Sequence, residues 1–126
     1  MTVINTAIAD FNAGNQTGWV GACDTPASII DDFSPYYWQG AHACADWWKD
    51  FEAFAKKSGA TENVVKLNGV RHMEAGKNFA YVVLNATYTY KQKGKPMSEP
   101  GAQLILAMTR TPGGWRMAGW TWSAPK

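Results

Sequence analysis

The sequence predicts an α+β domain in which helices cover one face of an antiparallel sheet, and two patterns support this. Through residue 57, apolar residues in several segments recur every three or four positions, as on the buried face of a helix. After Gly59 the pattern changes to the two-residue period of strands, in four segments separated by glycine-containing turns, as in a meander. With 126 residues, 46% of them hydrophobic, the chain is expected to form one domain over residues 1–126.

Three helices are predicted in the first half of the chain. Residues 2–14 place their apolar side chains on one face, with Thr2 as the N-cap, and residues 16–23 form at most a short second helix. The strongest helical pattern covers residues 41–57, and Gly59 can end that helix in a left-handed conformation. The apolar stripe of this long helix consists of Cys44, Trp47, Trp48, Phe51, Phe54 and Ala55.

Six strands are predicted, two before the long helix and four after it. Pro96 and Pro100 favour an irregular entry, such as a bulge, into the third strand of the meander. Asp31 and Asp32 are neighbours on the first strand, so only one of them is expected to face the interior. The predicted strands are 27–33, 36–39, 64–74, 78–90, 102–110 and 115–123.

The long strand 78–90 is apolar on both sides. A strand with one face in solvent should instead alternate between apolar and polar residues along its length. Helices can cover only one face of the sheet. We therefore expect a second subunit to cover the other, which gives a homodimer through the sheet face.

Composition disfavours several classes of function. A net charge of +2 without a clustered basic face gives no case for nucleic-acid binding. We expect neither membrane association nor a signal peptide, because no apolar run approaches about 20 residues and no basic segment precedes one. Cys23 and Cys44 are far apart, without ligand-like spacing, and are expected to be reduced, buried thiols in a cytoplasmic protein. Neither a metal nor a cofactor is expected, because nucleotide-binding motifs and clustered metal ligands are absent.

The order of these elements resembles the nuclear transport factor 2-like superfamily, and several short segments resemble it too. They are Phe11-Asn12-Ala13-Gly14 at the end of the first helix, Ile29-Ile30-Asp31-Asp32-Phe33 followed by Gly40, and Gly114-Trp115-Arg116-Met117 through Trp122-Ser123 in the last strand. The resemblance places the chain near the SnoaL-like and ketosteroid isomerase-like groups. It implies a cystatin-like cone, formed by a curved sheet around a long helix, with a small apolar pocket. Members of this superfamily differ in activity, so the fold leaves the chemistry open.

Asp31 is the position that resembles the general base of the ketosteroid isomerases, nine residues before Gly40. An aspartate in an aromatic pocket has a raised pKa and accepts protons better near neutral pH. The alternative is that both aspartates only accept hydrogen bonds from loop N–H groups. The isomerase oxyanion donors do not carry over, because their positions fall at Ala7 and at Ile105 or Leu106.

Other candidates are weaker. His72 shares a strand face with Glu74 and is considered as an acid–base residue, like the histidine of the dehydratases that the resemblance includes. The alternative for each candidate is a packed or surface side chain. The predicted ligand-binding residues, aromatic side chains that could wall a pocket, are Trp38, Trp47, Tyr88, Trp120 and Trp122.

Three functions remain open from the sequence. The first is a cofactor-free isomerase, cyclase, dehydratase or hydrolase that acts on a small hydrophobic or aromatic metabolite, with Asp31 as base. The second is a non-catalytic protein that binds such a ligand or associates with a partner. The third is a structural subunit of a larger enzyme.

Overall fold

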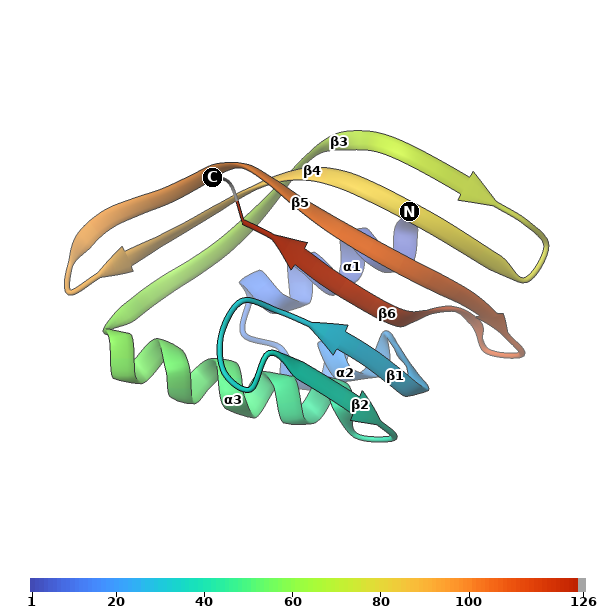
Figure 1. Ribbon diagram of the computed structural model, residues 1–126, viewed down its shortest axis with the longest axis horizontal. Helices are drawn as coiled ribbons and strands as arrows, with labels where there is room; N and C mark the ends of the chain where they lie inside the picture. Colours follow the sequence, from blue (N-terminus) through green and yellow to red (C-terminus); the bar gives the residue numbers. More distant parts are fainter. Residues whose placement is uncertain (125–126) are drawn as a thin grey trace.

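The computed structural model describes residues 1–124, which form three helices and one six-stranded sheet (Figure 1). The predicted α+β class and the order of elements are confirmed. The elements are α1 (Thr2–Asn12), α2 (Gln16–Gly21), β1 (Cys23–Ile30), β2 (Tyr37–Gly40), α3 (Ala43–Ser58), β3 (Ala60–Ala75), β4 (Phe79–Gln92), β5 (Lys95–Thr111) and β6 (Gly114–Ser123).

The sheet has the strand order β2-β1-β6-β5-β4-β3. Strands β3 to β6 form the predicted antiparallel meander, and β1 joins it as a parallel neighbour of β6. Figure 1 shows the long strands β3, β4 and β5 curving above α3. The concave side of the sheet therefore faces α3 (Figure 1).

Bulges accompany this curvature, because an extra residue in one strand bends it and increases its twist. The pairing of β3 with β4 shifts register at three points. The bulge predicted near Pro100 is confirmed: Ala102 pairs with Ala86, whereas Glu99 pairs with Tyr88, so β5 holds one extra residue there. This bulge decides which side chains of β5 face inward.

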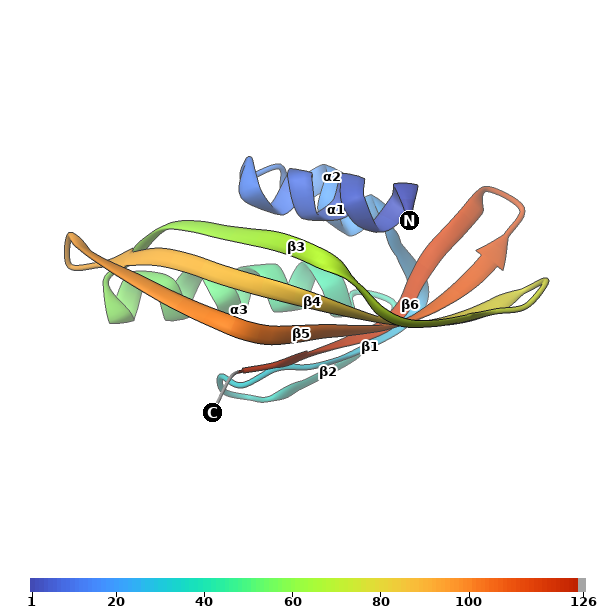
Figure 2. The same cartoon turned by 90° about the horizontal axis from the view of Figure 1, so that it is seen from above.

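The helices pack on the concave face around a hydrophobic core that contains both aromatic and aliphatic side chains. Figure 2 shows α1 and α2 together beside β3, with α3 crossing behind the sheet. In α1 the predicted face is buried through Ile4, Ala7 and Ile8. In α3 the buried residues include Trp47 and Trp48. No helix in the described part of the chain is long and apolar enough to cross a membrane.

The element boundaries differ from the predictions where local signals were ambiguous. Thr2 is inside α1 and Met1 occupies the N-cap position, so the predicted cap is wrong. Gly59 does end α3, with φ of 76° in the left-handed region, as predicted. The first strand begins at Cys23 and ends at Ile30, which leaves Asp31 in the turn between β1 and β2.

The predicted reduced state of the cysteines is wrong, because Cys23 and Cys44 form a disulfide between β1 and α3. They are separated by 21 residues in sequence, yet their Cα atoms lie 6.6 Å apart. Sequence spacing gave no sign of the bond, because packing of α3 against β1 brings the two residues together. Disulfides are rare in reducing compartments. Reduced cysteines therefore no longer support the expected cytoplasmic location.

Candidate functional site

A cavity of about 230 Å³ lies between α3, the β1–β2 turn and the concave face of the meander. It is smaller than the roughly 300–1,000 Å³ typical of pockets for drug-sized ligands, so it suits a small molecule. All three helices and four of the strands contribute to its wall. The lining residues are Ile8, Phe11, Trp19, Asp31, Asp32, Phe33, Trp47, Phe51, Phe54, Ser58, Ala60, Val65, Tyr88, Tyr90, Gln92, Glu99, Leu104, Trp120 and Trp122.

Asp31 is placed in this wall by the turn that follows β1. Its backbone N–H donates to the carbonyl of Tyr36 at 3.1 Å, which closes the turn. Its side chain is 9% exposed and accepts two hydrogen bonds, from the Trp47 indole N–H at 2.9 Å and from the Asp32 backbone N–H at 2.8 Å. The carboxylate is thus held in one orientation by α3 and by its own turn.

The prediction that only one of the two aspartates faces inward is wrong, because both Asp31 and Asp32 line the cavity. The prediction assumed strand geometry, in which neighbours point to opposite faces. Both residues instead belong to the turn, where this alternation does not apply. Asp31 is buried in the wall, whereas Asp32 is exposed.

Burial raises the pKa of Asp31 from 3.8 to about 7. Loss of water around the carboxylate is the largest cause, because the charged form is the one that water stabilises. The hydrogen bonds from Asp32 and Trp47 oppose the rise, since they stabilise the charged form, and the Asp32 charge adds to it. The result is a carboxyl group that can take up and release a proton near neutral pH.

The wall around Asp31 is made of aromatic rings packed against one another. The Trp47 ring stacks on Phe51 at a centroid distance of 5.1 Å and meets Trp120 edge to face at 5.0 Å. On β4, the Tyr88 ring stacks on Tyr90 at a centroid distance of 4.9 Å, and it lies 6.2 Å from the ring of Trp122 on β6. These contacts fix the rings, so the cavity has rigid, flat walls.

Glu99 adds a further carboxylate to the wall. Desolvation raises its pKa above the usual value, a hydrogen bond from Trp122 lowers it, and the Asp32 charge raises it. Burial and the charge of Glu99 also raise the pKa of Tyr88, whose hydroxyl donates to Asn63. The acidic groups of this cavity therefore influence one another electrostatically.

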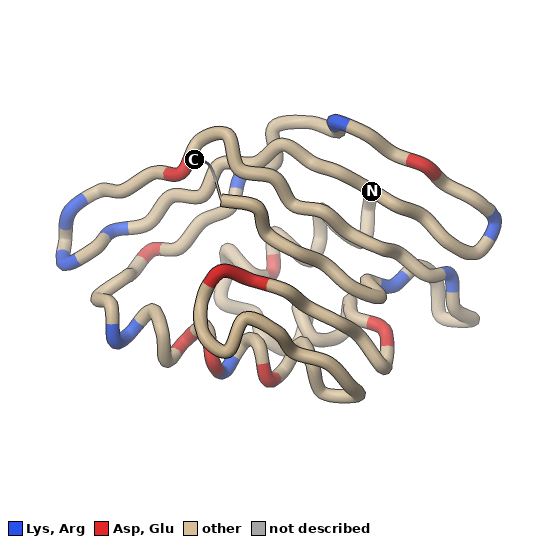
Figure 3. The backbone as a smooth tube through the Cα atoms, in the orientation of Figure 1, with Lys and Arg blue, Asp and Glu red and all other residues tan. Residues whose placement is uncertain are grey.

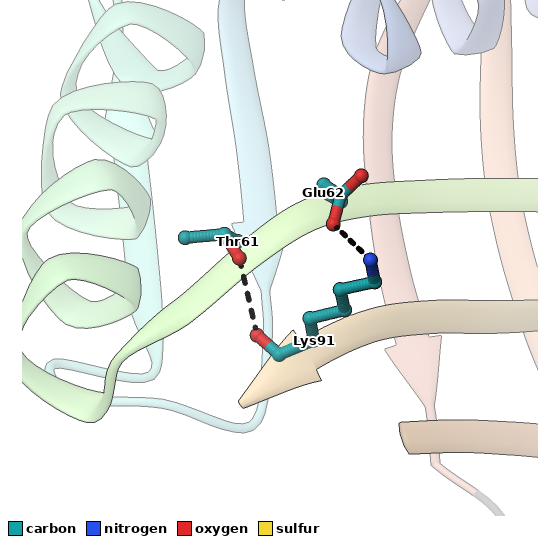
Figure 4. Close-up of polar contacts among 3 residues, drawn as sticks. All are labelled: Thr61, Glu62 and Lys91. Carbon is teal, nitrogen blue, oxygen red and sulfur yellow. Dashed lines mark hydrogen bonds and ion pairs between the residues drawn. The ribbon is translucent and has the colours of Figure 1, made fainter. Parts of the chain in front are cut away.

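Basic side chains lie elsewhere. Within residues 1–124, no Lys, Arg or His lines the cavity. Figure 3 shows acidic residues on the β1–β2 turn and basic residues at the β4–β5 hairpin. Lys91 follows Tyr90 on β4 and therefore projects to the opposite face, where its ammonium pairs with Glu62 at 3.0 Å (Figure 4).

Of the seven predicted site residues, five line the cavity: Asp31, Trp47, Tyr88, Trp120 and Trp122. Trp38 does not. It is buried against Phe33, and its indole N–H donates to Asp50 on α3 at 2.8 Å.

The expectation that His72 could face inward is wrong. A register shift between Val70 and His72 turns His72 to the outer face of the sheet, opposite Val83. There it is exposed, with its Nε2 atom 3.5 Å from Glu74.

Three buried polar atoms in the described residues lack a hydrogen-bond partner: the indole nitrogens of Trp19 and Trp120 and Oε1 of Glu99. The two tryptophans meet edge to face at 5.7 Å inside the aromatic cluster, where each nitrogen lacks exposed surface. In the same part of the chain, no group of three His, Cys, Asp or Glu side chains is arranged to bind a metal ion.

Four further residues line the cavity and are not among those predicted from the sequence: Glu99, Asp32, Trp19 and Phe33. Without the bulge in β5, alternation from Leu104 would point Pro100 inward, and the bulge puts Glu99 there instead. The residues near Pro100 indicate that β5 has a bulge, but they do not indicate at which residue it occurs. Trp19 and Phe33 carried only the general signal of aromatic residues.

Comparison with known proteins defines the fold. No protein-family model matches the chain, and no curated protein does. Solved structures do match, among them a nuclear transport factor 2-like superfamily protein from Salmonella enterica, with a TM-score of 0.80 and 15% identity over 99% of this chain and 87% of that one. This chain has the nuclear transport factor 2-like fold.

Two further structures with this fold support the assignment. A nuclear transport factor 2-like protein with a cystatin-like fold from Novosphingobium aromaticivorans matches with a TM-score of 0.75 and 13% identity over 98% of this chain and 77% of that one. A ketosteroid isomerase-like protein from Erwinia carotovora atroseptica matches with a TM-score of 0.76 and 14% identity over 99% of this chain and 92% of that one. The nuclear transport factor 2-like fold expected from the resemblance is thereby confirmed. Such low identities leave the activity to be argued from the site.

Proposed function

We propose that this chain binds a small hydrophobic or aromatic molecule in its cavity and transfers a proton on it, with Asp31 as the general base. The observation that carries the proposal is a nearly buried carboxylate in the wall of an open aromatic cavity, with a pKa raised to about 7. No cofactor is needed for such a step, because the acid–base group belongs to the chain.

The geometry around Asp31 supports this role. The Trp47 and Asp32 N–H groups hold the carboxylate, while its desolvation makes it a stronger base than an aspartate in water. A ligand against the aromatic wall would present its acidic proton to Asp31, which takes the proton while the bonding electron pair stays on the ligand. The same step can begin an isomerisation, a cyclisation or a dehydration.

A neutral aromatic probe tests this base without knowledge of the natural substrate. The ring opening of 5-nitrobenzisoxazole needs only removal of one C–H proton and is followed by absorbance. We expect the wild-type protein to accelerate it beyond free acetate at equal concentration, and Asp31→Asn to lose about 100-fold or more of that rate. Asp50→Asn is the matched control, because Asp50 also accepts from a tryptophan but does not line the cavity. Equal rates in the two variants would contradict the role of Asp31.

A non-catalytic binding protein is the second candidate. The observation that favours it is the lack of the isomerase donors, since their positions hold Ala7 and the buried, apolar Leu106. In that case the wild-type protein binds ligands but shows no acceleration of the probe reaction, and Asp31→Asn leaves ligand affinity within a few-fold.

We also propose that the outer face of the sheet pairs with a second copy of the chain. In register across the sheet, this face presents Tyr37, Ile30, Thr121, Ile105 and Val83. Tyr37 is 51% and Ile30 56% exposed, and on the same face Phe79 is 70% exposed. An exposed apolar face of this kind supports a two-fold symmetric contact.

Two substitutions of similar exposure test the dimer. Tyr81, 44% exposed, is on the outer face, whereas Met73, 41% exposed, pairs with Val82 on the opposite face. We expect light scattering to give a dimer mass for the wild type and for Met73→Glu, and a monomer mass for Tyr81→Glu. A monomeric wild-type protein at micromolar concentration would reject the dimer.

A further inference from the structure

We propose that the ligand of this cavity is a small organic cation, a protonated or quaternary amine with apolar substituents. The inference rests on the proposed function in that it takes the cavity to be the ligand site. It adds the chemical class of the ligand, which follows from the charges and the rings that line the wall.

The charges on the wall all have one sign. Asp31, Asp32 and Glu99 line the cavity from two elements, the β1–β2 turn and β5, and no basic side chain of the described residues lines it. The nearest basic residue along β4, Lys91, is on the other face and already paired with Glu62. An anionic ligand would add to the repulsion among these carboxylates, whereas a cation would relieve it.

The apolar part of the wall suits the same ligand. Ten of the lining residues are aromatic, and the faces of Trp, Tyr and Phe rings attract cations through their π electrons. Glu99 lines the cavity together with the rings of Tyr88, Tyr90 and Trp122. The centroid of the Tyr88 ring is 4.9 Å from that of Tyr90 and 6.2 Å from that of Trp122. Aromatic faces next to a carboxylate form the type of environment that binds alkylated ammonium groups.

Two features separate an organic cation from the alternatives. The carboxylates are not grouped as metal ligands anywhere in residues 1–124, so a compact metal ion has no set of donors here. Within residues 1–124, Oε1 of Glu99 accepts no hydrogen bond, so no donor at that oxygen offsets the charge of this carboxylate. An organic cation in the cavity offsets that charge through space, whereas a neutral hydrocarbon of the same shape does not.

Three probes of nearly equal shape test the charge preference. They are benzyltrimethylammonium, its neutral isostere neopentylbenzene and the anion phenylmethanesulfonate, each titrated against the wild-type protein with tryptophan fluorescence as the readout. We expect the cation to bind about 5- to 30-fold more tightly than the neutral isostere, and the anion to bind most weakly. Equal or tighter binding of the neutral probe would overturn the charge preference while leaving the cavity as a ligand site. Absence of binding by all three would overturn both proposals.

Matched glutamate variants assign the preference to the cavity. Glu99→Gln should weaken binding of benzyltrimethylammonium by roughly fivefold and leave neopentylbenzene within twofold. Glu62→Gln removes an equal charge from the other face, beside Lys91, and should change neither affinity. An equal loss of cation affinity in both variants would mean that net charge, and not the cavity, attracts the probe, and would overturn the proposal. Circular dichroism of each variant confirms that it is folded.

Discussion

Two tryptophan–aspartate pairs join α3 to the β1–β2 hairpin, and they differ in their surroundings. In one pair Trp47 of α3 donates to Asp31 of the turn at 2.9 Å. In the other, Trp38 of β2 donates to Asp50 of α3 at 2.8 Å. The bonds are nearly equal in length and chemistry. Asp31 is enclosed by the aromatic wall of the cavity, whereas Asp50 is only partly buried and does not line it.

For Asp31 the environment, and not the hydrogen bond, raises the pKa of the carboxyl group. The indole N–H lowers the pKa of Asp31, so the bond alone would make it a weaker base. Desolvation by the surrounding rings outweighs that effect and raises the pKa to about 7. The Trp38–Asp50 pair serves as an internal reference for the same contact outside the cavity.

The largest expected effect concerns stability and pH. Because the pKa of Asp31 is raised in the folded state, from 3.8 to about 7, its favourable contribution is fully present below pH 3.8 and is lost as pH rises towards 7. Asp31→Asn imitates the protonated form. We therefore expect it to be more stable than the wild type at pH 8, by on the order of 2–4 kcal/mol, and similar to it near pH 4.

Urea unfolding at both pH values measures this, with Asp50→Asn as the control for loss of a tryptophan–aspartate bond. The control should lower stability at both pH values. If Asp31→Asn behaved like the control, the cavity would not desolvate Asp31.

The next effect concerns the disulfide, which ties the same two elements together. Closing a loop of this size stabilises a fold by about 3 kcal/mol in the chain-entropy model. We therefore expect the Cys23→Ala/Cys44→Ala variant to be less stable by about that amount. Urea unfolding with and without reductant measures the loss in the wild type. Two thiols titrating in the unreduced native protein would contradict the bond itself.

The smallest effect separates the two indole donors. Trp47→Phe removes the N–H that stabilises the charged form of Asp31, so the pKa of Asp31 should rise further, by about one unit or less. Trp38→Phe removes a similar donor from Asp50 and should leave the pKa of Asp31 unchanged. The pH dependence of the probe reaction reports this pKa, because the rate rises as Asp31 ionises. A shift of equal size in both variants would contradict the local role of Trp47.

Much of the fold could be predicted because its signals are local. The stripe of Trp47, Phe51 and Ala55 indicates a helix, and Gly59 ends it because glycine adopts a positive φ at little cost. Alternation in the second half of the chain predicts the meander. The strand boundaries were less accurate, since β5 continues back through Pro96 and Pro100 to Lys95, where local signals favoured an irregular segment.

The candidate site could be predicted only in part. Asp31 and four of the aromatic residues could be proposed from residue type and resemblance. The roles of Glu99, His72 and Trp38 depend on single-residue register and on the packing of α3. In a strand, a shift of one residue moves a side chain to the other face, and the bulges in β3 and β5 each cause such a shift.

The helices, the meander and an acidic residue among many aromatic ones can be predicted from the chain, because these features depend on neighbours within a few positions. Tertiary packing was needed to show that Cys23 bonds to Cys44, that Asp31, Asp32 and Glu99 share one cavity, and that Lys91 lies outside it. Burial, charge and pKa depend on distances in space. Curvature of the sheet and packing of α3 set those distances between residues remote in sequence.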